Sequence, residues 1–424
     1  MRTQKTSGEA SAWRQKSKLL AAGLLLAAML IAGTVAASPA QAATTFTVNS
    51  TADTPDASLA GTACDTDLFT GGDQCTLRAA IQQANATPGA DAVSFAIPGT
   101  GVKTIAVGST GNGALPTIAD QVSINGYSQP GASTNTLAKG TNARLVMELN
   151  GSAAGGADGL EIGAGGGGSV IKGLVINRFS NQGIDVLSDA PTNVRIEGNF
   201  VGTDPSGTTA LPNRGDGIEM DASDSAVGGS TPAKRNLISG NDVDGLSISG
   251  DAKEVRVEGN LVGTKADGIG ALANLFNGVD VEGGTTGASI LGNSIFSNGQ
   301  LGIDLGVNGR TLNDLGDADA GANGLQNFPV ISSAKTGSTT TIAGKLNSQP
   351  NKTFEVEFFS NPAGTDEGKA FIGHKSVTTN GSGNVTFTFK SAQKVAKGKT
   401  VTATATDPSG NTSEFSAPRT VAAS

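Results

Sequence analysis

A short unit with the pattern glycine, aliphatic, variable, aliphatic recurs six times in the chain, and no other feature constrains the fold as strongly. Its copies read DGLEI (158–162), QGIDV (182–186), DGIEM (216–220), DGLSI (244–248), NGVDV (277–281) and LGIDL (301–305). The glycines are 24, 34, 28, 33 and 24 residues apart, and residues 194–221 and 255–282 agree at 13 of 28 positions. Short strands at such a period predict an all-β solenoid whose stacked coils share one interior of Ile, Val and Leu.

Asparagine follows glycine at comparable places in the repeats, at Asn199, Asn241, Asn260 and Asn293. Asparagine tolerates tight left-handed turns, and its amide can bond the backbone of a neighbouring coil. We therefore expect these side chains to hold the coils together rather than to bind a ligand.

The repeat sequences resemble those of a known class of proteins. EGNFVGTD (197–204), EGNLVGTK (258–265) and VGGSTPAKRNLISGN (227–241) are similar to repeats of secreted bacterial right-handed parallel β-helix proteins, which share the pectate-lyase (pectin lyase-like) architecture. CTLRAAIQQAN (75–85) is similar to their N-terminal signature, usually written Cys-Ser-Leu-Arg-Glu-Ala, but has Thr76 and Ala79 in place of Ser and Glu. The resemblance implies a fold but no single activity, because β-helices occur in enzymes, adhesins and structural spikes alike.

Residues 1–42 have the composition of a signal peptide. Basic residues precede the apolar run LLAAGLLLAAMLIAGTVAA (19–37), and Ala40-Gln41-Ala42 fits a signal-peptidase site. The alternative is an uncleaved anchor, because the run is nearly long enough to span a bilayer. We expect cleavage, hence a secreted, extracellular protein with no membrane span in the mature chain.

The mature chain divides into two predicted domains. Residues 43–326 form the right-handed parallel β-helix, with an N-terminal cap at about 43–90. Residues 327–424 alternate short strands with turn signals such as TTNGSGN (378–384), which predicts a seven-stranded immunoglobulin-like β-sandwich. His374 lies in this second domain, where we expect it at the surface.

The predicted cap contains a short amphipathic helix. Its apolar residues Leu77, Ala80, Ile81 and Ala84 follow helical spacing, and Thr76 is a suitable N-cap. A helix here would cover the open first coil, with a partner-binding helix as the alternative. Cys64 and Cys75 lie close together in an exported chain, so a disulfide is predicted rather than two free thiols.

Charge and composition exclude several functions. Removal of the first 42 residues takes away five basic residues and one acid, which changes the net charge from −8 to −12. Such an acidic chain is unsuited to nucleic acid or anionic membranes, which require basic patches. With His374 as the one histidine, the chain also lacks the parts of a Ser-His-Asp triad or a His-rich zinc site. The sequence does not predict an oligomeric state.

The repeat places acids in line on the outside of the solenoid. In each unit both aliphatic residues face inward, so the residue between them faces outward. This outward position, here called the acidic column, holds Glu161, Asp185, Glu219, Ser247, Asp280 and Asp304. A neighbouring outward column contains Asp221 and Glu282. Like charges on coils about 4.8 Å apart repel, so five acids in six positions require an explanation.

Three explanations fit the acidic column. The acids can form a solvated binding face, or hold a hard cation such as Ca²⁺, which prefers carboxylate oxygens. They can also be catalytic. Glu219 and Asp280 lie two coils, or about 9.6 Å, apart, which overlaps the separation in an inverting glycosidase, and Asp280 and Asp304 would suit a retaining one.

A binding face is the preferred interpretation, with Asp185, Asp221, Glu282 and Asp304 as ligand-binding residues. Glycan-active enzymes usually stack sugars on Trp or Tyr, and after the signal the chain offers only Tyr127. Two insertions, residues 202–214 and 263–275, are placed to form walls beside the acidic column and make a groove, with tolerated surface insertions as the alternative.

A second acidic segment, NDLGDADAGANG (313–324), joins the two domains. Asp314, Asp317 and Asp319 are candidate calcium ligands there, although the spacing does not match an EF-hand and a plain linker needs no metal.

The sequence as a whole predicts a secreted or cell-surface β-helix protein. Its elongated face would bind an extracellular polysaccharide or a cell surface without catalysis. The alternative is a polysaccharide hydrolase or lyase that acts in a groove on the β-helix, with Glu219 and Asp280 as the catalytic acids.

Overall fold

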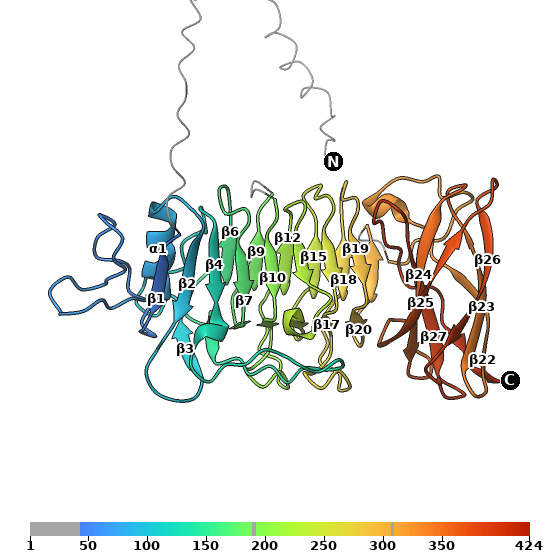
Figure 1. The fold of residues 1–424 in the computed structure, drawn as a ribbon, viewed down its shortest axis with the longest axis horizontal. Coiled ribbons are helices and arrows are strands. Elements are labelled where there is room, and N and C mark those ends of the chain that lie inside the picture. Colours follow the sequence, from blue (N-terminus) through green and yellow to red (C-terminus); the bar gives the residue numbers. More distant parts are fainter. Residues whose placement is uncertain (1–42, 189–191, 307–308) are drawn as a thin grey trace, which may run out of the picture. The chain divides into compact units, whose positions relative to one another are not determined.

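The computed structural model describes residues 43–188, 192–306 and 309–424, so the predicted signal peptide lies outside the described residues. Three parallel sheets extend through residues 45–305, and successive strands pass from the first sheet to the second and third in each full coil (Figure 1). Connections between parallel strands are right-handed. The solenoid is therefore the predicted right-handed parallel β-helix.

The sheets are built from short strands, one per coil. The first contains β1 (Thr45–Val48), β2 (Asp91–Phe95), β4 (Val122–Asn125), β7 (Val170–Lys172), β10 (Arg195–Glu197), β13 (Ala226–Gly228), β16 (Arg256–Glu258) and β19 (Ser289–Leu291). The second contains β3 (Lys103–Ala106), β5 (Met147–Asn150), β8 (Leu174–Asn177), β11 (Phe200–Val201), β14 (Leu237–Ile238), β17 (Leu261–Val262) and β20 (Ser294–Ile295). The third contains β6 (Leu160–Ile162), β9 (Ile184–Val186), β12 (Ile218–Met220), β15 (Leu246–Ile248), β18 (Val279–Val281) and β21 (Ile303–Leu305). Three short 3-10 helices complete the connections: η1 (Gly126–Ser128), η2 (Pro232–Lys234) and η3 (Ala322–Leu325).

Helix α1 (Leu77–Ala86) covers the first coil, as predicted (Figure 1). The Thr76 hydroxyl accepts the N–H of Ala79 at 3.1 Å, which makes Thr76 the N-cap. The apolar face of α1 is buried and contacts β1 and β2. The predicted disulfide between Cys64 and Cys75 is present and fixes the loop that precedes the helix.

Two asparagine ladders join the coils inside the turns. In the first, amide groups bond from coil to coil through Asn199, Asn236, Asn260 and Asn293. The second runs through Asn213, Asn241, Asn274 and Asn298. The structural role predicted for asparagine is confirmed. Asn241, however, belongs to a different ladder from Asn199, Asn260 and Asn293.

After the solenoid, residues 330–423 form a sandwich of two four-stranded sheets. One contains β22 (Val330–Thr336), β23 (Thr340–Asn347), β26 (Asn384–Ser391) and β29 (Ala422–Ala423), and the other β24 (Thr353–Asn361), β25 (Ala370–Thr378), β27 (Thr400–Thr406) and β28 (Arg419–Thr420). The prediction of seven strands is wrong: the sandwich has eight, because two short strands follow the six longer ones and pair with β27 and β22. The immunoglobulin-like type stays a prediction. His374 is exposed, as expected.

The sandwich closes the last coil of the solenoid. Phe359 and Phe415 belong to the solenoid's apolar core, and Ile295 of β20 exchanges two backbone hydrogen bonds with Gly368. Three buried glutamates of the sandwich accept backbone N–H groups from the end of the solenoid: Glu357, Glu367 and Glu414. No helix in the described part of the chain combines the length and apolar character needed to cross a membrane.

Candidate functional site

The acidic column forms an unbroken line on the third sheet. Glu161 pairs in register with Asp185, Asp185 with Glu219, Glu219 with Ser247, Ser247 with Asp280, and Asp280 with Asp304. The flanking aliphatic residues of every unit are buried in the solenoid core. The predicted alternation of inward and outward residues is therefore correct in all six coils.

Accessibility changes along the acidic column. Asp185 and Glu219 are half-buried, as are Asp221 and Glu282 in the neighbouring column. By contrast, Asp280 and Asp304 are each only 2% exposed. A ligand can therefore reach the first four carboxylates, whereas the last two lie beneath the surface.

The buried end of the acidic column has incomplete hydrogen bonding. One oxygen of Asp280 and one of Asp304, Oδ1 in each, are buried without a partner among the described residues. The other oxygen of Asp304 accepts only long bonds, from Gly309 N–H at 3.4 Å and the Asn277 amide at 3.5 Å. A buried acceptor without a donor is costly in free energy, so this end of the column is not optimised for stability.

Burial and mutual repulsion raise the pKa of several of these acids. Burial, reinforced by Glu219, raises the pKa of Asp185 to about 7. Burial also raises the pKa of Glu219, with a further contribution from Asp221. The pKa of Asp280 is strongly raised by burial and by the adjacent Glu282. Carboxylic acids held neutral near pH 7 can donate as well as accept hydrogen bonds.

The structure reveals a third line of acids that was not predicted. The sequence signal for this line is the Asp that directly precedes the Gly in three of the repeat units. Asp158, Asp216 and Asp244 each accept the backbone N–H of the corresponding residue one coil further on. Burial raises the pKa of Asp216 to about 7 and that of Asp244 to about 6. These aspartates connect the coils and add to the negative charge beside the acidic column.

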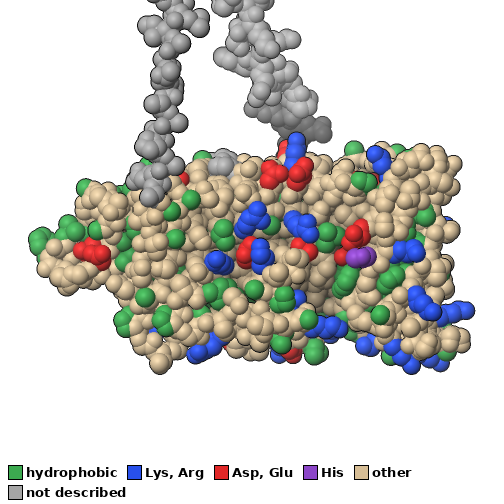
Figure 2. Space-filling view, in the orientation of Figure 1, with side chains coloured by type: hydrophobic (Ala, Val, Ile, Leu, Met, Phe, Trp, Pro, Cys, Tyr) green, Lys and Arg blue, Asp and Glu red, His purple; other side chains and the backbone are tan. Residues whose placement is uncertain are grey.

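No basic side chain forms an ion pair with the acidic column in the described ranges. The first sheet is different, because Lys234 pairs with Glu197 at 2.8 Å and Arg256 with Glu258 at 2.9 Å. Figure 2 shows such mixed charges on the face that carries His374. Among the described residues, the acidic column thus differs from the first sheet in having no basic partner.

The two insertions do not form walls beside the acidic column, contrary to the prediction. Ala266 donates its N–H to Gly207 O, which joins one insertion to the other. Ala266 also packs against a cluster on the outside of the second sheet that includes Phe200 and Leu237. Both insertions therefore cover the second sheet.

Tyr127 is not available to stack a sugar. It packs against the same cluster on the second sheet, and its hydroxyl donates to Gly198 O at 2.7 Å. An interaction between a glycan and the acidic column would therefore depend on polar contacts.

Two groups of acids bring their oxygens close enough to share a cation. In each, three carboxylate oxygens lie within 4.8 Å of one another: Asp158, Glu161 and Asp185 in one group, and Asp314, Asp317 and Asp319 in the other. Asp317, however, already accepts Asn327 N–H at 2.8 Å and the Ser348 hydroxyl at 2.5 Å. These bonds attach the linker to the sandwich. They account for the burial of Asp317 without a metal.

No family model and no curated protein matches the chain. Among solved structures, the enzymatically active domain of tailspike protein 2 from bacteriophage CBA120 has a TM-score of 0.23 at 10% identity, covering 79% of this chain and 67% of that one. The full-length tailspike protein 2 of an Escherichia coli O157:H7 bacteriophage has a TM-score of 0.24 at 10% identity, with 85% of this chain covering 53% of the tailspike. The tailspike gp49 of Acinetobacter baumannii bacteriophage Fri1, a capsular polysaccharide depolymerase, has a TM-score of 0.13 at 12% identity, with coverage of 78% and 69%. This chain therefore spans about half of the full-length tailspike.

Proposed function

We propose that this protein is an exported β-helix protein that binds an extracellular glycan, free or on a cell surface, through the acidic column without catalysing a reaction. The observation that supports the proposal most strongly is the alignment of five acids in six coils without a compensating cation. Repulsion between them costs stability, and a role in binding accounts for that cost.

The chemistry of the acidic column favours a neutral or amino-sugar polymer. Carboxylates accept hydrogen bonds from sugar hydroxyls, and protonated acids such as Asp185 can donate them. An anionic glycan would be repelled by this face. The coil repeat places the accessible acids at regular intervals, which suits a repeating ligand better than a single small molecule.

The test is binding of residues 43–424 to immobilised neutral and amino-sugar polysaccharides, with calcium and after its removal by EGTA. A triple variant, Glu219→Gln, Asp221→Asn and Glu282→Gln, removes three accessible carboxylates and keeps their size. We expect at least a tenfold loss of affinity, since each lost charge-assisted hydrogen bond contributes about 1.5–3 kcal/mol. A matched control is the double variant Glu197→Gln and Glu258→Gln on the first sheet, which should bind like the wild type. Equal binding by the triple variant and the wild type would reject this face as the site.

A hydrolase is the second candidate, and one observation favours it. Asp280 has a strongly raised pKa beside the Glu282 carboxylate, and a general acid must be protonated at the working pH. Its counterpart would be Glu219, two coils away. Reducing ends released from each bound polysaccharide would be measured for the wild type, Glu219→Gln and Asp280→Asn. An enzyme loses turnover in both variants, whereas a binding protein releases no reducing ends in any of the three.

A further inference from the structure

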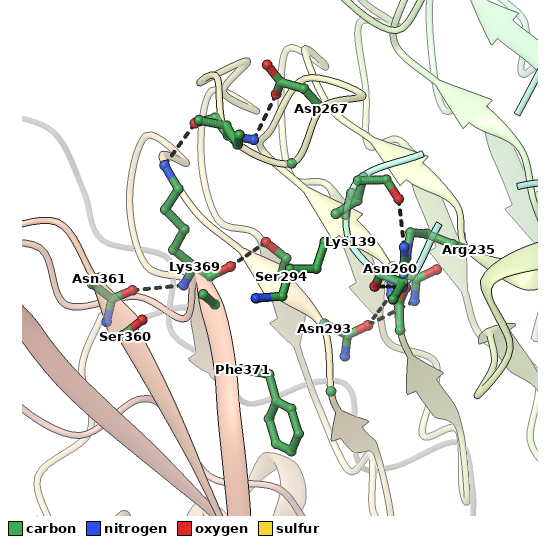
Figure 3. Close-up of a pocket in the computed structure, with 18 of the residues that line it drawn as sticks. Lys139, Arg235, Asn260, Asp267, Asn293, Ser294, Ser360, Asn361, Lys369 and Phe371 are labelled. Atoms are coloured by element: carbon green, nitrogen blue, oxygen red, sulfur yellow. Dashed lines mark hydrogen bonds between the residues drawn. The ribbon is translucent and has the colours of Figure 1, made fainter. Parts of the chain in front are cut away.

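A cavity of about 540 Å³ opens where the sandwich meets the solenoid, and no residue of the acidic column lines it. Its walls come from the segment 138–140, from turns beside the second sheet, and from the edge of the sandwich at β24 and β25 (Figure 3). Cavities of this size are typical of small-molecule sites.

One wall is held in place by Arg235. Its guanidinium donates to the carbonyl oxygens of Leu137 at 2.9 Å, Ala138 at 3.0 Å, Gly140 at 2.6 Å and Gly259 at 2.8 Å. These bonds fix the 137–140 segment against the solenoid (Figure 3). Four of the five guanidinium N–H groups are used in these bonds, so Arg235 contributes mainly its charge to the cavity.

The opposite wall is held by Lys369. Its ammonium donates to Ile269 O at 2.8 Å and lies 3.8 Å from the centre of the Phe296 ring. Its own carbonyl accepts the Ser294 hydroxyl at 2.6 Å. Burial, with the nearby charge of Lys399, lowers the pKa of Lys369. An anion in the cavity would relieve that repulsion.

Two further lysines line the cavity with their ammonium groups free. Lys139 and Lys399 are exposed, and neither forms an ion pair within the described ranges. The one acid in the lining, Asp267, uses its carboxylate to accept the N–H groups of Ile269 and Gly270. The cavity is therefore cationic in a chain whose net charge is −8.

The cavity also offers apolar surface. The Phe371 ring is half-buried in the lining, and Ile269, which also lines the cavity, is 70% exposed. A ligand that satisfies both surfaces needs an apolar face and a negative charge. A pyranose ring has such a face in its C–H groups, and a phosphate or carboxylate on the ring supplies the charge.

We infer that this cavity binds a saccharide unit that carries a negative charge. The ring packs against Phe371, and the charged group pairs with the ammonium groups of Lys139 and Lys399. Lysine binds compact oxyanions as a point charge. The site is separate from the acidic column, so either one can fail without the other.

Isothermal titration of residues 43–424 with four probes tests the inference: glucose 6-phosphate, glucuronate, glucose and inorganic phosphate. We expect a Kd below about 1 mM for at least one charged sugar, and at least tenfold weaker binding of glucose and of phosphate. The two charged sugars distinguish phosphate from carboxylate as the preferred group. If glucose or phosphate binds as tightly as both charged sugars, or no probe binds, the inference is wrong.

Variants locate the site. The double variant Lys139→Gln and Lys399→Gln should weaken the charged sugar about tenfold, and Phe371→Leu should weaken it about threefold while leaving phosphate unaffected. Lys390→Gln, an exposed lysine of the sandwich outside the cavity, is the matched control and should change nothing. Equal affinity in the double variant and the Lys390 control would overturn the assignment, and thermal unfolding would verify that every variant is folded.

Discussion

The N-terminal cap and the acidic column both bury carboxylates, but the two regions differ in how many hydrogen-bond partners these carboxylates have. In the cap, Asp53 is 1% exposed and Arg78 is 5% exposed, and two bonds of 2.9 Å join them. Arg78 also donates to two carbonyl oxygens, and Asp53 accepts Gly108 N–H at 2.7 Å. In the column, Asp280 and Asp304 are equally buried, yet each leaves one oxygen without a partner in the part of the chain that the structure describes.

This difference shows that burial of an acid in this fold does not by itself leave its carboxylate without hydrogen-bond partners. The cap satisfies its buried pair completely, as expected of a group that stabilises the fold. Among the described residues the acidic column has neither a basic partner nor a donor for every buried oxygen, which is expected where a ligand is to supply them. Four predictions follow from this contrast, in order of decreasing effect.

Arg78→Met should have the largest effect, because it leaves Asp53 buried without its partner. We expect a loss of about 3–5 kcal/mol in the free energy of unfolding, measured with urea. Arg214→Met is the control, since the Arg214 side chain is 73% exposed and its pair with Asp242 spans 3.5 Å, so its loss should cost less than about 1 kcal/mol. Similar losses of unfolding free energy in both variants would mean that the buried Asp53–Arg78 pair contributes no more to stability than an exposed pair.

The second prediction concerns pH. Asp185, Asp216 and Asp244 have pKa values of about 7, 7 and 6 in the folded protein, above those of an unfolded aspartate. The folded state therefore binds more protons between about pH 4 and pH 7, and the stability they contribute is lost as pH rises through this range. We expect the Tm to be about 5 °C lower at pH 8 than at pH 5. A Tm that rises over this interval would contradict the pKa assignments.

The third prediction concerns the buried end of the acidic column and uses the variant Asp280→Asn. At pH 8 the wild type must hold either a buried charge or a proton on Asp280, whereas asparagine is neutral. We expect the variant to gain about 1–2 kcal/mol at pH 8 and to change little at pH 5, as measured by urea unfolding at both values. Destabilisation at both pH values would show that the Asp280 carboxylate makes a contact that stabilises the fold.

The coil period, the inward and outward directions of the repeat-unit side chains, and the N-cap of the helix could be predicted from the sequence. The glycine spacing sets the coil period, and the two aliphatic residues of each unit must face inward, so the alignment of Glu219 with Asp185 follows from pattern alone. Thr76 as N-cap followed from helix periodicity in the same way.

Other features depend on contacts that no local pattern encodes. The period does not determine which way an insertion folds, so the location of residues 202–214 over the second sheet was missed. The burial of Asp280 depends on what surrounds it in space. The cavity combines Arg235 of the solenoid with Lys369 and Phe371 of the sandwich, and nothing in either segment indicates the other.

The smallest effect is expected on the first sheet, where acids have partners. Glu258→Gln removes the carboxylate that pairs with Arg256 at 2.9 Å, in a pair whose arginine side chain is 56% exposed. Exposed pairs contribute about 0–1 kcal/mol, so the Tm should change by no more than about 2 °C. The difference in Tm between pH 5 and pH 8 should equal that of the wild type, because this face contributes none of the raised pKa values considered above. If Glu258→Gln reduced that difference as much as Asp280→Asn, the pH dependence would reflect total negative charge rather than the acidic column.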